Sequence, residues 1–238
     1  MRHSHNRYRF PSRPDLTPRG HALAAGAGAG TLNTMTKLIL GSRNKKKLRE
    51  MLDLLGDLGL DLSDLTPYPD APEVAETAGT FVGNATLKAT TLAPVLRAWV
   101  IGEDSGLVVP ALGSDPGVDS ALYAGKHGDD AGNNAKLLAE LAKLPPGADR
   151  SAYYISTAVL SDPTGKVVAT TEGRCHGVIV DELRGAGGFG YDPLFLVPEY
   201  GKTFGELPPE VKQAMSHRAK AFAQLRPALE RLGRRPPV

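Results

Sequence analysis

Two adjacent acids, Glu103 and Asp104, are the residues best suited to chemistry on a charged substrate. They stand in the segment GEDSGL, and we expect an acidic turn there between two short strands in Trp99–Val109. Carboxylate oxygens are the ligands that Mg²⁺ prefers, and a carboxylate can also help to activate a water. Considered alone, the segment is more simply a turn with exposed acids, so a catalytic role needs support from other segments.

A basic segment near the N-terminal end of the expected domain could bind phosphate. LGSRNKKK, at 40–47, joins an expected strand to an expected helix, and such a loop presents free backbone N–H groups at a positive helix end. Its polar and cationic side chains are Ser42, Arg43, Asn44, Lys45, Lys46 and Lys47. The pattern GxxxxGK[ST] is absent, so this is not a P-loop, and a solvated basic helix start is the alternative.

Two further segments hold charged side chains that suit phosphate chemistry. Glu76 is a possible further metal ligand and Lys88 could neutralise phosphate charge, although each alone is more simply explained as a surface group. Later in the chain, Lys212, His217 and Arg218 surround an expected helix start. Lys and Arg in a first turn oppose the helix dipole, and such a local misfit indicates function.

The segment GFGYDPLF, at 188–195, is unusual because aromatic residues stand among glycines. Glycine lets the backbone approach a ligand closely, and an aromatic ring offers it a flat apolar face. Phe189 is the candidate for stacking on a base, with Gly190 and Tyr191 beside it, and Asp192 is expected to orient a neighbour. The alternative is a strand end and turn with core aromatics.

The hydrophobic pattern predicts the elements that position these segments. A short buried strand is expected at 37–40, followed by a helix whose apolar residues run from Leu48 to Leu58. After a proline-rich connection, further helices are expected at 84–96 and 133–144, the second of which ends at two prolines.

The second half of the chain is richer in strands. Segments 151–162 and 166–180 are β-rich and meet at the turn signal DPTG, which predicts a hairpin. A last helix is expected from Ser216 as N-cap, with Pro227 kinking or interrupting it. Together the elements predict an α/β fold, a central mixed twisted sheet with flanking helices.

Composition bounds the organisation of the 238 residues, of which 41% are hydrophobic and 23% charged. We expect residues 1–34 to be a disordered extension and residues 35–238 a single domain, with either Met1 or Met35 as the true start. The first 34 residues hold five arginines and one acid, which leaves 23 basic and 25 acidic residues in the rest. Bulk charge therefore does not imply nucleic-acid binding.

A single cysteine, Cys175, excludes an intramolecular disulfide and a thiolate metal cluster, and favours a reducing cytoplasmic location. No run of about 18 apolar residues is present, so we expect no membrane span.

The segments follow one another in an order that closely resembles the non-standard purine NTP pyrophosphatases, also called inosine triphosphate or dITP/XTP pyrophosphatases. The resemblance covers about residues 36–232 and rests on GSRNKKKLRE, TFVGNATLKA, EDSGLVVPALGSDPGVDSALYAG, GGFGYDPLF and SHRAKA. It implies two lobes around an active-site cleft, a homodimer, and Mg²⁺-dependent cleavage of ITP, dITP or XTP to the monophosphate and pyrophosphate.

The resemblance also implies a role for each matching residue. Asp104 would be the proton acceptor and a metal ligand, with Glu76 and Glu103 as further metal ligands. Ser42 to Lys47 and Lys88 would bind the phosphates, and Lys88 would also be catalytic. Ser105 would lie beside the substrate. The base and sugar would be bound by Phe189, Gly190, Tyr191 and Asp192, and the 6-keto group by Lys212, His217 and Arg218.

Two other functions stay open. The chain could be a nucleotide-binding module that does not cleave, although binding alone would not require the acids. It could also be a pyrophosphatase for pyrimidine or other modified nucleotides, which shares the chemistry and differs at the base.

Overall fold

The structure is a computed structural model that describes residues 35–233. The expected extension at 1–34 lies outside the described residues, as does 234–238. Within the described part, no helix combines the length and the apolar character that a membrane crossing requires.

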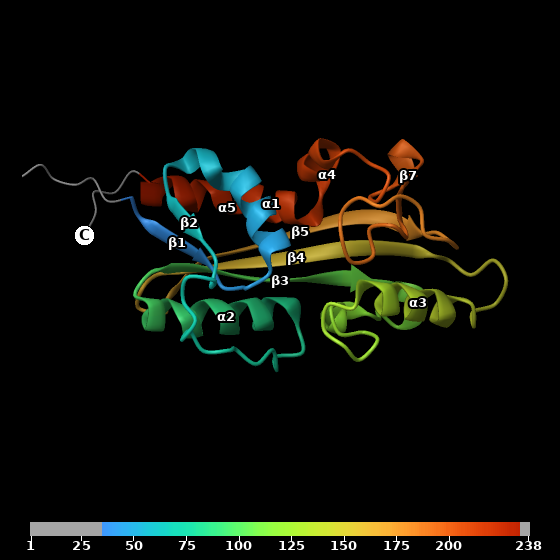
Figure 1. Ribbon diagram of the computed structural model, residues 1–238, viewed down its shortest axis with the longest axis horizontal. Coiled ribbons are helices and arrows are strands. Elements are labelled where there is room, and N and C mark those ends of the chain that lie inside the picture. Colours follow the sequence, from blue (N-terminus) through green and yellow to red (C-terminus); the bar gives the residue numbers. More distant parts are fainter. Residues whose placement is uncertain (1–34, 234–238) are drawn as a thin grey trace, which may run out of the picture. The chain divides into compact units, whose positions relative to one another are not determined.

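A seven-stranded mixed sheet forms the centre of the fold, as predicted (Figure 1). Its order is β2-β1-β3-β4-β5-β6-β7, in which β2, β1 and β3 are parallel and the later neighbours are antiparallel. The strands are β1 (Lys37–Leu40), β2 (Asp61–Ser63), β3 (Trp99–Val108), β4 (Ser151–Ser161), β5 (Val167–Ile179), β6 (Phe195–Val197) and β7 (Lys202–Thr203).

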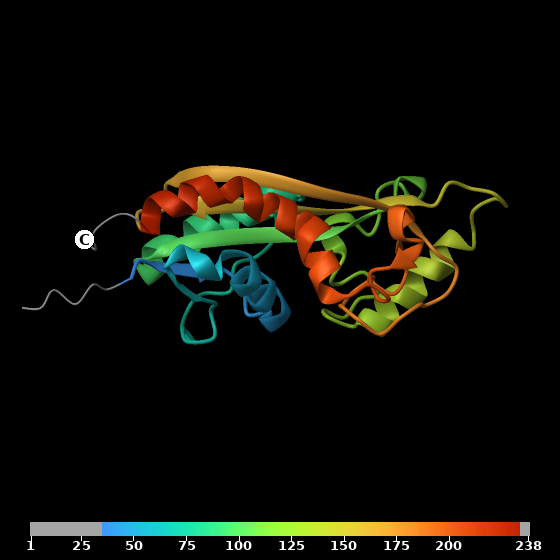
Figure 2. The same cartoon turned by 90° about the horizontal axis from the view of Figure 1, so that it is seen from above.

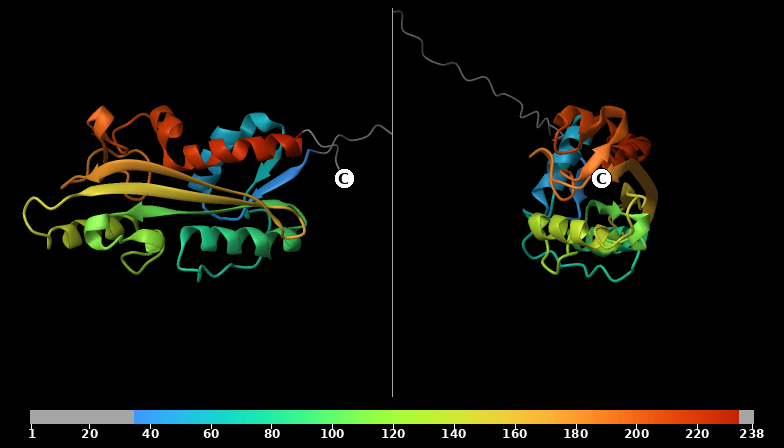
Figure 3. Two further views of the ribbon diagram at one scale, coloured as in Figure 1. Left: turned by 180° about the vertical axis from the view of Figure 1, so that it is seen from behind. Right: turned by 90° about the vertical axis from the view of Figure 1, so that its right-hand side faces the viewer.

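Helices cover both faces of this sheet. In Figure 1, α2 and α3 lie on one face, and α1, α4 and α5 lie on the other; the same division is visible from behind in Figure 3. The α-helices are α1 (Lys45–Leu55), α2 (Phe81–Leu96), α3 (Asp130–Leu141), α4 (Pro209–Met215) and α5 (His217–Gly233). Short 3₁₀ helices span Gly56–Leu58, Pro110–Leu112, Gly117–Asp119 and Pro198–Tyr200.

Two large hydrophobic clusters share the long strands. One packs α1 and α5 against β1, β3 and β4 through residues such as Met51, Leu160 and Phe222. The other packs α3 and the β6–β7 region against β3, β4 and β5, with Leu137 and Phe195 at its centre. The strands β3, β4 and β5 therefore join the two clusters, as their length in Figure 2 illustrates.

The prediction of an acidic turn between two strands at 99–109 is wrong. This segment is one continuous strand, β3, in which Glu103 pairs with Ala158 and Asp104 with Thr157 of β4. Acids between glycines are typical of a turn, but the backbone of these residues pairs with the eleven-residue strand β4 and so continues the sheet.

The predicted helices and the hairpin are present with bounds that differ by a few residues, whereas strands β2, β6 and β7 were not predicted. The 151–180 hairpin is present, and the Ser216 hydroxyl caps α5 by accepting from Ala219 N at 3.1 Å. The short helix α4 before it was not predicted. Helix α5 runs through Pro227 without interruption, because buried residues on both sides, including Phe222 and Leu229, hold it against the sheet.

Gly102 explains how α2 comes so close to β3. A β-carbon at this position would lie 2.7 Å from Ala89 N and would also collide with Ala85 O, both in the backbone of α2. No real side chain tolerates such contacts, so glycine is required where the helix crosses the strand. The close crossing brings Asn84 and Lys88 of α2 to Asp104, two residues further along β3.

Candidate active site

Glu103 and Asp104 point to opposite faces of the sheet, because consecutive residues of a strand do so. The Glu103 carboxylate meets α1 and α5 on one face, and the Asp104 carboxylate meets α2 on the other. Figure 1 shows these helices on the two sides of β3. The sequence-adjacent acids therefore have separate environments.

Glu103 is surrounded by cations although it is only 1% exposed. Its carboxylate lies 2.6 Å from Lys47 Nζ and 3.1 Å from Arg218 Nη2, and it accepts from Ser156 Oγ at 2.8 Å. Burial alone would raise the pKa of Glu103, but the charges of Arg218 and Lys47 hold it well below the usual range. Glu103 is thus a fixed anion that orders the two cations.

At Asp104, burial and the neighbouring charges affect the pKa differently. Its carboxylate accepts from Asn84 Nδ2 at 3.1 Å and lies 3.3 Å from Lys88 Nζ, which also lies 2.7 Å from Glu76. Burial raises the pKa of Asp104 to about 6, against the lowering effect of Lys88. A carboxylate with such a pKa is a better proton acceptor near neutral pH than an ordinary aspartate.

The resemblance implied three metal ligands, Glu76, Glu103 and Asp104, and that assignment stays a prediction. No group of three or more His, Cys, Asp or Glu in residues 35–233 is arranged to hold a metal ion. Both Glu103 oxygens are engaged by cations or Ser156, whereas Glu76 and Asp104 meet at one ammonium group, and Glu76 is partly exposed. Two carboxylates suit Mg²⁺, which usually completes its coordination with waters and substrate phosphates.

In the segment 40–47, we expected free backbone N–H groups at the start of the helix, and the structure differs. Asn44 is the N-cap of α1, and its side chain accepts from Lys46 N and Lys47 N at 3.0 and 3.3 Å. Ser42 Oγ in turn accepts from Asn44 N. The side chain of Asn44 thus satisfies two backbone donors of the first turn, and phosphate binding by Ser42 to Lys47 stays a prediction.

Four residues of that segment, three lysines and Arg43, have distinct surroundings. Lys46 lies 3.5 Å from Asp130, and Lys47 reaches Glu103 as described. Lys45 is exposed. The guanidinium of Arg43 instead donates to the carbonyls of Tyr68, Pro69 and Ala71 at 3.2–3.3 Å and so ties down the proline-rich connection. Its role in substrate binding stays a prediction.

Phe189 and Asp192 lie together in the loop before β6. Asp192 Oδ2 accepts from Phe189 N at 2.8 Å and lies 2.6 Å from Lys212 Nζ, so Asp192 orients both neighbours. Lys212 Nζ is also 4.6 Å from the centre of the half-buried Phe189 ring. The ring of Tyr191 packs in the hydrophobic core, and its hydroxyl donates to Ser120 O. A role of Tyr191 in binding the base or sugar stays a prediction.

Arg218 lies between Phe189 and two acids, Glu50 and Glu103. It is 2% exposed, and it donates to Ser105 Oγ at 3.1 Å as well as to Glu103. Its other partner, Glu50 of α1, also lies 3.3 Å from Lys212. The cations at the start of α5 are therefore paired with acids from distant elements, the buried Glu103 of β3 and the partly buried Glu50 of α1.

His217 is buried beside Arg218 and stacks on Tyr154, with ring centres 4.8 Å apart. Burial, assisted by the charge of Arg218, lowers the pKa of His217 well below its usual range, so the imidazole is neutral. Its Nδ1 atom has no hydrogen-bond partner within the described residues. Because this nitrogen is itself buried, the assignment of His217 to the base site stays a prediction.

The sequence did not identify several residues that support this site. Glu50, Asn84 and Ser156 each hold a predicted residue in place, yet none carries a pattern of its own. Asn84 stands in the quoted segment TFVGNATLKA, where a buried amide four residues before Lys88 on the same helix face was the available signal.

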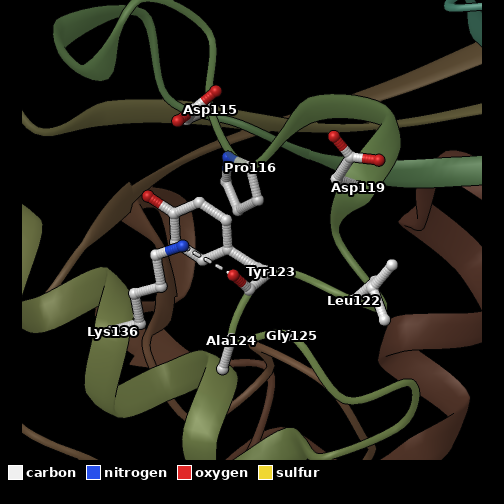
Figure 4. Close-up of a pocket in the computed structure, with 8 residues that line it drawn as sticks. All are labelled: Asp115, Pro116, Asp119, Leu122, Tyr123, Ala124, Gly125 and Lys136. Atoms are coloured by element: carbon white, nitrogen blue, oxygen red, sulfur yellow. Dashed lines mark hydrogen bonds between the residues drawn. The ribbon is translucent and has the colours of Figure 1, made fainter.

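Two surface depressions lie away from these residues. One, of about 460 Å³, is lined by Asp115, Tyr123 and Lys136 among others, and Figure 4 shows the Lys136 ammonium donating to Tyr123 O beside the Tyr123 ring. The other, of about 580 Å³, lies around Arg150 and Arg184. Neither contains a predicted site residue, so the expected cleft between two lobes stays a prediction.

Comparison with known proteins agrees with this arrangement. The chain is 48% identical over 201 residues to a Rhodopirellula baltica protein named dITP/XTP pyrophosphatase, a match that covers 84% of this chain and 96% of the relative. A Geobacter sulfurreducens protein of the same name is also 48% identical, over 192 residues, with 81% and 96% covered.

Solved structures give the same result. A HAM1 protein from Coxiella burnetii has a TM-score of 0.76 at 39% identity, covering 83% of this chain and 100% of that one. A Mycobacterium abscessus nucleoside-triphosphatase, titled dITP/XTP pyrophosphatase, has a TM-score of 0.66 at 43% identity, covering 81% and 100%. The family model described as Ham1 family matches residues 38–228, and this chain belongs to the Ham1 family.

Proposed function

We propose that this protein is a nucleoside triphosphate pyrophosphatase that hydrolyses non-standard purine nucleotides, ITP, dITP and XTP, to the monophosphate and pyrophosphate. The observation that carries the proposal is the buried Asp104 carboxylate, which has a raised pKa and is held between Asn84 and Lys88. The relatives named dITP/XTP pyrophosphatase support the choice of substrate.

In this proposal, Asp104 accepts a proton from the water that attacks the α-phosphorus, and Asn84 holds the carboxylate in the orientation that receives it. Lys88 is cationic, since the nearby Asp104 and Glu76 carboxylates raise its pKa in spite of burial. Lys47 and Lys88 would then stabilise the negative charge that grows on the departing pyrophosphate.

Mg²⁺ is the proposed cofactor, with Glu76 and Asp104 as its protein ligands. When bound, it would neutralise phosphate charge and fix the geometry of the triphosphate. Glu103 would act through Lys47 and Arg218, which it holds in place, rather than as a metal ligand.

Selectivity for a 6-keto purine would come from donors near Phe189. Lys212 and Arg218 carry N–H groups only, and a keto oxygen accepts hydrogen bonds, whereas the 6-amino group of adenine donates them. Both cations already pair with acids, and a keto oxygen would accept a further N–H from them, whereas the amino group of adenine would set a donor against them, which costs binding energy. His217 would contribute to the same wall of the base site.

Product analysis tests the reaction type. Incubation of the purified protein with ITP and Mg²⁺ should give IMP and pyrophosphate in equal amounts, because the attack is at the α-phosphorus. Formation of IDP and orthophosphate would assign the attack to the γ-phosphorus and contradict the proposal. Tight ITP binding without any product would favour the non-catalytic module.

The proposal also includes a homodimer that works in the cytoplasm, as the sequence resemblance implied. Light scattering of the full chain should give about twice the mass of 25.2 kDa. A mass of one chain would leave the reaction proposal intact and remove the dimer from it.

A further inference from the structure

The backbone of Gly190 is held from both sides by helix α3. Gly190 N donates to Asp130 Oδ2 at 3.0 Å, and Gly190 O accepts from Asn134 Nδ2 at 2.8 Å. Asp130 and Asn134 are one helical turn apart on α3, so both face the same loop. The two bonds satisfy both polar groups of a single peptide residue in the loop.

This hold is needed because Gly190 lies in a left-handed conformation, with φ of +62°, directly after Phe189. Glycine reaches that conformation easily but also leaves it easily, so the position of the preceding ring depends on outside contacts. On the other side, Phe189 N is fixed by Asp192. The two-residue segment is thus fastened by side chains from α3 and from its own loop.

Asp130 has a second contact that reaches the phosphate loop. The same oxygen that accepts from Gly190 lies 3.5 Å from Lys46 Nζ, and Lys46 Nζ is 5.2 Å from the centre of the Phe189 ring. Asp130 therefore stands where the loop proposed to bind phosphates meets the loop proposed to bind the base. Its side chain is 43% exposed, so replacing it does not open the core.

Asn134 is more deeply placed. It is 5% exposed, and its Nδ2 group donates to Asp130 O at 2.7 Å as well as to Gly190 O. This buried amide therefore donates both to the loop and to the first turn of its own helix, and so connects the loop to α3.

We propose that Asp130 and Asn134 are positioning residues, which hold the Gly190 backbone and so place the Phe189 ring for stacking on the substrate base. The inference rests on the proposed function for the identity of that base. The hold itself is a property of the protein without nucleotide, so it can be tested separately.

Hydrogen–deuterium exchange of the full chain without nucleotide tests the hold. Asp130→Ala and Asn134→Ala should each speed exchange of the segment 187–193 about fivefold to tenfold, the loss expected for one backbone hydrogen bond. Asp130→Asn keeps an acceptor for Gly190 N and should restore most of the protection. Unchanged exchange in both alanine variants would overturn the inference, whatever the enzyme hydrolyses.

Asp129→Asn is the matched control, because it removes one charge at the same helix start. Asp129 is the N-cap of α3 and accepts from Gly132 N, and asparagine caps equally well. This variant should leave exchange of 187–193 at the wild-type rate. Faster exchange in the control would show that helix-end charge, rather than the Gly190 contacts, protects the loop, and would contradict the inference.

Steady-state kinetics then tests the consequence. Asp130→Ala and Asn134→Ala should raise KM for ITP about tenfold with a smaller change in kcat, because the ring is proposed to bind the base rather than the reacting phosphate. A merely structural role predicts a fall in kcat together with a lower melting temperature, and that result would overturn the inference. If wild type itself does not hydrolyse ITP while exchange responds as expected, the proposed function fails and the hold stands.

Discussion

At the scale of single residues, the proposed site contains two side chains whose buried surroundings favour the neutral state. Asp104 has its pKa raised to about 6, mainly by burial, and His217 has its pKa lowered, again mainly by burial. Glu103, one residue away from Asp104, is held as an anion by Arg218 and Lys47. Adjacent carboxylates are thus given different roles by the opposite faces of one strand.

Asp104→Asn should lower kcat/KM for ITP by a factor of about 10² to 10⁴, because an amide cannot take the proton from water. The melting temperature should not fall, since the neutral amide avoids the cost of burying a charge. Pyrophosphate release at saturating Mg²⁺ and differential scanning fluorimetry measure the two effects. Near-normal turnover would remove Asp104 from the role of proton acceptor.

His217 should make the folded state sensitive to acid. The folded protein keeps this imidazole neutral, while the unfolded chain takes up a proton as the pH falls below about 6.5, so stability from this group is present above that pH and lost below it. The melting temperature of wild type should therefore fall relative to that of His217→Gln between about pH 7.5 and about pH 5.5. A constant difference across this range would show that His217 does not titrate in this way.

At the scale of elements, the site depends on how closely α2 crosses β3. Gly102→Ala would place a β-carbon against the α2 backbone, and we expect a loss of about 1–3 kcal/mol in the free energy of unfolding. Moving α2 also displaces Lys88 and Asn84 from Asp104, so kcat should fall. Chemical denaturation and the ITP assay measure the two effects.

Gly56→Ala is the control for that variant, because Gly56 at the end of α1 has ordinary φ of −62° and open space around it. It should leave stability and turnover close to wild type. Equal losses in both variants would contradict the crossing argument.

Elements whose signals are local could be predicted from the sequence. The hairpin at 151–180 has a clear turn between two β-rich runs, and the Ser216 cap and the α1 helix follow from nearby residues. The continuity of β3 could not be predicted, because only its pairing with β4 shows that the acids lie within a strand.

The partners of the predicted site residues were beyond sequence reasoning for the same reason. Glu50 and Arg218 are 168 positions apart, and Ser156 and Glu103 are 53 apart, so their contacts exist only once the sheet has formed. Local patterns identified the charged groups, and tertiary packing decided which of them pair.

At the scale of the whole molecule, the described part contains every candidate site residue and both large hydrophobic clusters. A chain that begins at Met35 should therefore have the melting temperature of the full chain and its kcat/KM for ITP within about a factor of two, since among the described residues the core begins at Leu38. A large loss in either quantity would show that residues 1–34 contribute to the fold or to the site.

The most direct test of the account is the rate of pyrophosphate release from a panel of nucleoside triphosphates at equal concentration with Mg²⁺. ITP, dITP and XTP should have kcat/KM values at least about a hundredfold above those of ATP and the pyrimidine nucleotides, because Lys212 and Arg218 are proposed to donate to the purine 6-position. Hydrolysis of ATP as fast as ITP, or a preference for pyrimidines, would contradict the account.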